Sequence, residues 1–334
     1  MTSQPVSEGL LIGVDAGGTS TRATLLDRSG RCIGYGASGS GNPTSAGPER
    51  AAQSVVDAVS RAVAAGGRRL DEVRGITAAM AGHGARGEGG WLADALAGAG
   101  IDGALGFESD LLALYYSGAS EPEGYAIVSG TGAAVIRVAE GDIDATADGL
   151  GWLLGDRGSG FWIGHHVALA AVEELDGRGP ATSLTPAVLA AFDIAPGKPL
   201  GYGRQVELEA LIREIYLHRP VELSRLAPLA FAATDDAVSR RILVEAGELL
   251  AKTFTAVHRG TGPLVVGGSV LAQPGVLSDT FSRRIAERDA DVQLRLVGDG
   301  VVGAAYLALR HAGVVLDAAG HAILSASVAA ARAR

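Results

Sequence analysis

Two short turns rich in glycine and hydroxyl side chains are the part of this sequence best suited to bind phosphate. Each lies between two apolar runs typical of strands, in GVDAGGTSTR (13–22) and VSGTGAAVIRV (128–138). The first turn contains Gly17, Gly18, Thr19, Ser20 and Thr21, and the second contains Gly130, Thr131 and Gly132. Glycine lets backbone N–H groups converge on an anion, and hydroxyl groups add donors. The pair predicts a polyphosphate held from two sides, with two ordinary hairpin turns as the alternative.

Two aspartates stand at the ends of predicted strands, where their carboxylates could take part in phosphate chemistry. Asp15 precedes the first turn and could bind Mg²⁺, a cation that prefers oxygen ligands. Asp110 ends a strand and starts a helix in GFESDLLALYY. An acid there could accept the proton of a hydroxyl group during phosphoryl transfer. The alternatives are a cap of its own turn for Asp15 and a helix N-cap for Asp110.

The segment GLGWLLGDRGSGFWIG (149–164) is the least generic of the chain. It contains six glycines, two tryptophans, one phenylalanine and Asp156. Close backbone approach, an aromatic face and an acid are features of a sugar-binding site. Asn42, in the loop SGSGNP (38–43), offers an amide, although turn chemistry alone could explain this residue.

A glycine-rich segment at 82–87, GHGARG, supports a competing interpretation. It matches G-x-G-x-x-G after a predicted strand, and Glu108 follows about 20 residues later, as in dinucleotide sites. Against this, the preceding strand is the fourth of its domain rather than the first. His83 lies in this loop and could contact a substrate. The adjacent His165 and His166 diverge on a helix and cannot chelate one ion together.

The composition argues against several functional classes. The chain has 334 residues and a net charge of −9, whereas a nucleic-acid partner would require a basic face. Its one cysteine, Cys32, cannot form an internal disulfide framework or a Cys-rich metal site, and we expect it to pack in a strand. No apolar run reaches the roughly 18 residues of a membrane span, and the first residues lack a signal-peptide pattern. We therefore expect a cytoplasmic protein without a membrane partner.

Strand and helix signals alternate along the chain and begin again near residue 121. The expected strands are 10–15, 21–27, 32–37, 74–81, 104–110, 125–129, 133–139, 263–266 and 292–297. The expected helices are 48–65, 88–97, 159–175, 234–259 and a last stretch from 299 towards 334. This order predicts an α/β protein of two domains, each starting with the same strand–turn–strand unit.

Taken together, these segments resemble the N-acetylglucosamine kinase-type sugar kinases of the BadF/BadG/BcrA/BcrD ATPase family. The resemblance covers most of the chain, because five family-like pieces occur in the family's order. They are the two phosphate loops (15–21 and 129–132), the acid Asp110, the sugar loop (149–164, usually ending GDEGSGxWIG) and the adenosine motif VVGGS (265–269). The run DGRGP (176–180) is a further family-like segment.

The resemblance implies an actin-like ATPase fold, in which two ribonuclease-H-like domains close on ATP and a sugar in an interdomain cleft. We place the domains at residues 1–118 and 119–334. The last helix, about 315–334, would pack back on the N-terminal domain. Homodimers are common in this family, although no stretch of the sequence indicates an interface.

The resemblance also implies roles for individual residues of an ATP-dependent hexosamine kinase. Asp110 would be the base that deprotonates the 6-hydroxyl of an amino sugar, N-acetylglucosamine first, and Asp15 would organise Mg²⁺. The two turns would bind the phosphates of ATP, and Gly267, Gly268 and Ser269 would line its adenosine. The expected sugar contacts are Asn42, Gly82, His83, Asp110, Thr131, Gly149, Gly151 and Asp156.

Three positions depart from the family pattern and leave the sugar open. Ala133 and Ala134 replace the usual serine and a sugar-binding asparagine, and Arg157 replaces the usual glutamate of the sugar loop. A cation near the sugar changes which substituent of the sugar the site can bind. Glucosamine and N-acetylmuramic acid are therefore alternative substrates. A nucleotide-dependent activator of another protein is an alternative of a different class. Its known branch needs cluster-binding cysteines, which Cys32 alone cannot supply.

Overall fold

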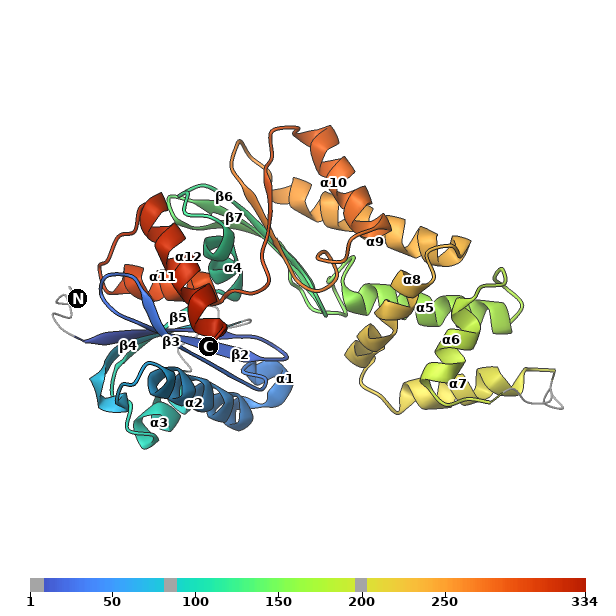
Figure 1. The fold of residues 1–334 in the computed structure, drawn as a ribbon. Coiled ribbons are helices and arrows are strands. Elements are labelled where there is room, and N and C mark those ends of the chain that lie inside the picture. Colours follow the sequence, from blue (N-terminus) through green and yellow to red (C-terminus); the bar gives the residue numbers. More distant parts are fainter. Residues whose placement is uncertain (1–8, 81–88, 196–202) are drawn as a thin grey trace.

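The computed structural model describes residues 9–80, 89–195 and 203–334, which form two five-stranded sheets with helices around them (Figure 1). The first sheet has the order β3-β2-β1-β4-β5. Its strands are β1 (Leu10–Ala16), β2 (Thr21–Leu26), β3 (Cys32–Ser38), β4 (Val73–Met80) and β5 (Ala104–Glu108). β1, β2 and β3 pair antiparallel, whereas β4 and β5 run parallel to β1. β1 is almost entirely buried, as its apolar sequence predicts for a central strand covered on both faces.

The second sheet repeats this arrangement. Its order is β10-β9-β6-β7-β8, with β6, β7 and β8 antiparallel and β9 and β10 parallel to β6. The strands are β6 (Gly124–Ser129), β7 (Ala133–Ala139), β8 (Asp142–Asp148), β9 (Leu264–Gly267) and β10 (Leu294–Leu296). Two sheets of this order and direction confirm the predicted α/β architecture of the actin-like ATPases. β8 was not expected from the sequence, because DIDATAD is a polar, half-exposed edge strand.

Helices cover both sheets. Those before the second sheet are α1 (Pro43–Ala46), α2 (Pro48–Ala65), the 3₁₀ turn η1 (Leu70–Glu72), α3 (Gly90–Gly98) and α4 (Asp110–Gly118). The helices after its first three strands are α5 (Gly160–Leu175), α6 (Leu184–Ala191), α7 (Val206–Tyr216), η2 (Pro220–Leu226), α8 (Ala227–Ala232), α9 (Ala237–Val257), α10 (Val276–Arg288), α11 (Val301–His311) and α12 (Ala318–Arg332). α2 and α3 lie on one side of the first sheet, and α11 and α12 lie on the other (Figure 1). No helix within the described ranges is long and apolar enough to cross a membrane.

α4 and α11 pack against each other between the two sheets and share one apolar core with β6 and β9. Their approach is close because Gly303 of α11 faces the carbonyl group of Ala113 on α4, where a Cβ atom would overlap it. The backbone N–H of Gly303 donates to the hydroxyl of Ser117 at 2.9 Å. These contacts fix the start of α4, and with it Asp110, relative to the segment that precedes α11.

We therefore expect Gly303→Ala to lower the free energy of unfolding by about 2–3 kcal/mol, because overpacking a tight helix contact forces the backbones apart. Urea denaturation followed by circular dichroism measures this change. Gly298→Ala is the matched control, since a Cβ there would meet no atom within 4 Å. Equal stability of the two variants would contradict the close approach of α4 and α11.

The helical stretch expected from residue 299 towards 334 consists of α11 and α12, and α12 lies within the last helix expected at about 315–334. Gly313 has a positive φ of 78° and follows the end of α11, and Asp317 caps α12 by accepting from the N–H of Gly320 at 2.8 Å. α12 lies against β3, where the hydroxyl of Ser327 accepts from the N–H of Cys32 at 2.9 Å. Cys32 is buried there, as expected of a packing residue in a strand.

Candidate active site

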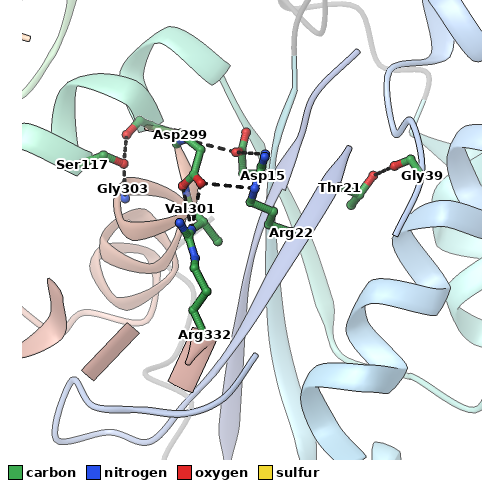
Figure 2. Close-up of polar contacts among 11 residues, drawn as sticks. Asp15, Thr21, Arg22, Gly39, Ser117, Asp299, Val301, Gly303 and Arg332 are labelled. Atoms are coloured by element: carbon green, nitrogen blue, oxygen red, sulfur yellow. Dashed lines mark hydrogen bonds and ion pairs between the residues drawn. The ribbon is translucent and has the colours of Figure 1, made fainter. Parts of the chain in front are cut away.

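Asp15 is a buried carboxylate near the end of β1, next to the first glycine turn. Its Oδ2 accepts a hydrogen bond from the N–H of Gly300 at 3.1 Å and lies 3.5 Å from Nη1 of Arg22 (Figure 2). Its Oδ1 has no hydrogen-bond partner among the residues that the structure describes. A Cβ at position 300 would lie 3.2 Å from this Oδ1, so glycine keeps the space beside it open. One carboxylate oxygen therefore remains available to a cation.

The pKa of Asp15 is raised from 3.8 to about 6. Burial is the largest cause, and the negative charges of Asp299 and Asp110 act in the same direction. Arg22 and the N–H of Gly300 oppose the shift. At neutral pH the carboxylate is still mostly ionised, and its unfavourable burial makes a bound cation favourable. No group of three or more His, Cys, Asp or Glu side chains in the described part of the chain could hold a metal by itself. A cation at Asp15 would thus need oxygen ligands from a substrate, as Mg²⁺ has with nucleotide phosphates.

Asp110 is the first residue of α4. Ser109 caps this helix by accepting from the N–H of Leu111, and the Oδ1 of Asp110 accepts from the same N–H at 3.0 Å. Burial raises the pKa of Asp110, and the hydrogen bond from Leu111 opposes this shift. The carboxyl group lies near enough to Asp15 for its charge to raise the pKa of Asp15. Asp110 therefore lies within electrostatic range of Asp15, and the catalytic and metal-binding roles of the two acids stay predictions.

The first turn lies beside this pair and is held by backbone hydrogen bonds. The N–H of Gly17 donates to the carbonyl of Ser20, and the N–H of Gly41 donates to the carbonyl of Gly17. Gly18 and Thr19 are exposed, so their backbones are open to a ligand. The hydroxyl of Thr21, however, is buried and donates to the carbonyl of Gly39 at 2.9 Å (Figure 2). Its donor is therefore engaged in fixing the loop that leads to Asn42.

Asn42 is the N-cap of the short helix α1, where its Oδ1 accepts from the N–H of Thr44 at 2.8 Å. The hydrogen bond between Gly41 and Gly17 places this loop next to the first turn. A Cβ at Gly41 would overlap the hydroxyl oxygen of Thr21, so only glycine fits there. This capping role agrees with the alternative that turn chemistry alone explains Asn42. The contact of Asn42 with a sugar stays a prediction.

Hydrogen bonds tie the second turn and the start of β7 to the sugar loop. The carbonyls of Gly130 and Thr131 accept from the N–H groups of Gly160 and Phe161 at 2.7 and 3.1 Å. The N–H of Ala133 donates to the Oδ1 of Asp156 at 3.0 Å. Asp156 has a positive φ of 55°, and burial raises its pKa. In this structure Asp156 joins the two segments, and its expected contact with a sugar stays a prediction.

The sugar loop is shaped by Asp148, whose carboxylate accepts from the N–H groups of Asp156 and Arg157 at 2.7 and 3.0 Å. Gly149 and Gly151 have positive φ values of 71° and 79°, which explains glycine at both positions. Trp152 contacts Phe161 with ring centroids 5.8 Å apart. The side chain of Arg157 is exposed and forms no ion pair within the described ranges.

The expected adenosine motif stands at the end of β9, next to the second turn. Gly268 has a φ of 90°, and a Cβ there would overlap the carbonyl oxygen of Ser129. The same carbonyl accepts from the N–H of Val270 at 2.9 Å. The hydroxyl of Ser129 donates to the carbonyl of Gly158 at 3.1 Å. Hydrogen bonds therefore hold the second turn, the sugar loop and Gly267–Ser269 together where the strands β6 and β9 end.

Gly82 and His83 lie outside the described residues, as does the rest of the glycine-rich segment 82–87. Glu108, the acid of the dinucleotide alternative, is paired instead with His311 at 2.8 Å and with Arg310 at 3.5 Å.

Sequence reasoning missed Asp299, Gly300, Arg22 and Arg332 around Asp15. Figure 2 shows the side chains of Arg22 and Arg332 meeting at Asp299. The signal in the sequence was an acid followed by glycine, Asp299-Gly300, at the start of the expected last helical stretch.

Comparison with protein families matches the chain to the BadF/BadG/BcrA/BcrD ATPase family over residues 12–308. The chain belongs to this family. Its match spans both glycine turns, Asp110, the sugar loop and the segment after β9. The family therefore confirms the resemblance drawn from these segments.

Relatives of known name support the same assignment. The chain is 26% identical over 330 residues to N-acetyl-D-glucosamine kinase of Dictyostelium discoideum, covering 91% of this chain and 99% of that protein. It is 25% identical over 284 residues to N-acetylmuramic acid/N-acetylglucosamine kinase of Clostridium acetobutylicum, covering 82% and 89%. A solved structure of a candidate N-acetylglucosamine kinase from Chromobacterium violaceum superposes with a TM-score of 0.71 at 24% identity, covering 90% of this chain and 99% of that one. The last likeness confirms the fold.

Proposed function

We propose that this protein is an ATP-dependent amino-sugar kinase that phosphorylates the 6-hydroxyl of its substrate. The observation that carries the proposal is a pair of acids, the buried Asp15 and the half-buried Asp110, beside a glycine turn with an open backbone. One acid has a carboxylate oxygen free for a cation, and the other begins a helix within electrostatic range of it. This is the set of groups that phosphoryl transfer to an alcohol requires.

In the proposed reaction, Asp110 accepts the proton of the sugar 6-hydroxyl while that oxygen attacks the γ-phosphorus of ATP. The bond from the γ-phosphorus to the bridging oxygen breaks, and ADP leaves. Because burial raises the pKa of Asp110, this carboxylate is a stronger base than an exposed aspartate. The N–H group of Leu111 holds it in a fixed orientation.

ATP and Mg²⁺ fit the residues that are present. Mg²⁺ bound with ATP would neutralise charge on the phosphates. Asp15 would hold the ion through Oδ1. The backbones of Gly17–Ser20 and Gly130–Gly132 would bind phosphate oxygens, and Gly267, Gly268 and Ser269 would line the adenosine. Asn42, Gly149, Gly151, Thr131 and Asp156 would contact the sugar, together with Gly82 and His83.

N-acetylglucosamine is the proposed sugar, with glucosamine and N-acetylmuramic acid as alternatives. The names of both relatives include N-acetylglucosamine as a substrate, and the name of one also includes N-acetylmuramic acid. We further propose a cytoplasmic homodimer, the state expected from the family resemblance. Light scattering tests the dimer directly.

Arg157 provides a test of the sugar. N-acetylmuramic acid differs from N-acetylglucosamine by a lactyl group that carries a carboxylate. We expect Arg157→Glu to lower kcat/KM for N-acetylmuramic acid, relative to N-acetylglucosamine, by about tenfold or more. The substitution replaces a cation that attracts this carboxylate by an anion that repels it. Steady-state kinetics with both sugars measures this ratio. Arg157→Gln should give an intermediate ratio. An unchanged ratio in both variants would show that Arg157 does not reach the sugar.

Sugar-dependent release of ADP over a panel of hexoses and hexosamines tests the proposed function. We expect release with N-acetylated or free amino sugars and much less with glucose. ATP hydrolysis that no sugar changes, together with a tight protein partner, would instead indicate an activator of another protein.

A further inference from the structure

Asp299 is a charged residue near the candidate metal carboxylate that the proposed reaction does not use. It lies in the segment between β10 and α11, one residue before Gly300, whose N–H binds Asp15. Its side chain is about one-tenth exposed. Burying a charged carboxylate to this extent costs free energy unless the charge is paired, so the partners of Asp299 must be identified.

Both oxygens of Asp299 are fully engaged. Oδ1 accepts from the N–H of Val301 at 3.2 Å and from Nη2 of Arg332 at 3.0 Å. Oδ2 lies 3.2 Å from Nε of Arg22 and 2.8 Å from Nη2 of Arg332. A carboxylate has about four lone-pair sites, so Asp299 has none left for a cation. Any influence on the metal site must therefore pass through its neighbours.

Arg22 is the neighbour that connects the two carboxylates. Its Nε lies at hydrogen-bond distance from Asp299, whereas its Nη1 remains 3.5 Å from the Oδ2 of Asp15. A close charged pair would be nearer 2.8 Å. The guanidinium group is thus held mainly by Asp299 and contacts Asp15 only loosely (Figure 2).

We propose that Asp299 is a positioning residue that holds Arg22 away from Asp15 and so keeps the Asp15 carboxylate free for Mg²⁺. Arg332, near the end of α12, fixes Asp299 in this position. Without Asp299, Arg22 would pair closely with Asp15 and compete with the metal as an internal cation. This inference rests on the proposed role of Asp15 as the metal carboxylate. It makes the C-terminal helix α12 part of the metal site.

The test measures how strongly Mg²⁺ enhances the binding of ADP, by calorimetric titration of ADP in saturating Mg²⁺ and in EDTA. For Asp299→Asn we expect the enhancement to fall by about tenfold, the size typical for a lost neighbour of a metal ligand. The affinity for ADP in EDTA should stay the same. In the double variant Asp299→Asn/Arg22→Gln, most of the enhancement should return, because the competing cation is gone.

Recovery on removal of Arg22 separates this mechanism from a structural role of Asp299, which a second substitution would not repair. If Asp299→Asn fails to fold, Arg332→Gln takes its place in the test. We expect Arg332→Gln to lower the Mg²⁺ enhancement of ADP binding as well, but by a smaller factor. Glu121→Gln is the matched control, since it removes the Glu121–Arg295 ion pair, with contacts of 2.7 and 3.0 Å, from another part of the molecule. Its Mg²⁺ enhancement should equal that of the wild type.

Two results would overturn the inference. One is an Asp299→Asn protein with wild-type enhancement, and the other is a double variant as impaired as Asp299→Asn. Failure of the proposed function would look different. In that case the wild-type protein itself would show neither Mg²⁺-enhanced ADP binding nor sugar phosphorylation.

Discussion

Asp110→Asn is expected to lower kcat by about a thousandfold, the range that a general base contributes to catalysis. The amide keeps the shape of the side chain and can still accept from the N–H of Leu111, so α4 should start at the same residue. It cannot take the proton of the sugar hydroxyl at neutral pH. Coupled-enzyme detection of ADP with saturating ATP and sugar measures kcat. KM for the sugar should change little, because the amide can still bind the hydroxyl group.

Glu108→Gln is the control for loss of a negative charge near the end of β5. Glu108 pairs with His311 and Arg310 of α11 and has no role in the proposed chemistry. A second measurement concerns the acidic side of the wild-type pH profile. Because burial raises the pKa of Asp110, kcat should fall on acidification at a pH above the usual range for aspartate. An Asp110→Asn enzyme with wild-type turnover would contradict the assignment of the base.

Asp15→Asn is expected to lower kcat/KM for ATP by at least about a hundredfold, since a metal-bound phosphate gains several kcal/mol of charge stabilisation. Its stability should not fall. The wild-type carboxylate is buried, and the charges of Asp299 and Asp110 act against it. A neutral amide removes this repulsion and can still accept from the N–H of Gly300. Thermal unfolding and kinetics, measured on the same sample, test both expectations.

Asp94→Asn, at an exposed position on α3, is the matched control for this substitution. It should change neither quantity. A marked loss of stability in Asp15→Asn would show that the carboxylate serves the fold rather than a metal ion. Unchanged kinetics would exclude Asp15 from the metal site.

The sequence was sufficient to predict the parts of the fold that depend on local patterns. Glycine turns between apolar runs predicted β1–β2 and β6–β7, and helical spacing predicted α2, α5 and α9 within three residues at each end. The polar edge strand β8 lacked such a pattern. The last helix was expected at about 315–334 and is α12, whose start follows Gly313 and the Asp317 cap.

Residue type and spacing were sufficient to select Asp15, Asp110 and the two turns as candidates, and their roles stay predictions. The long-range pairings of the candidate site were not predictable. The hydrogen bond from Gly300 to Asp15 joins residues 285 positions apart, and no local pattern indicates such a contact. Likewise, the sequence could not show that Asp156 binds the backbone of Ala133, or that Thr21 uses its hydroxyl on Gly39.

The most direct test of the central claim is to identify the product formed from ATP and N-acetylglucosamine by phosphorus and proton NMR. An amino-sugar kinase of the proposed kind yields one 6-phosphate for each ADP, and Asp110→Asn yields almost none under the same conditions. ADP formed without any sugar phosphate, or a phosphate on another hydroxyl group, would contradict the account.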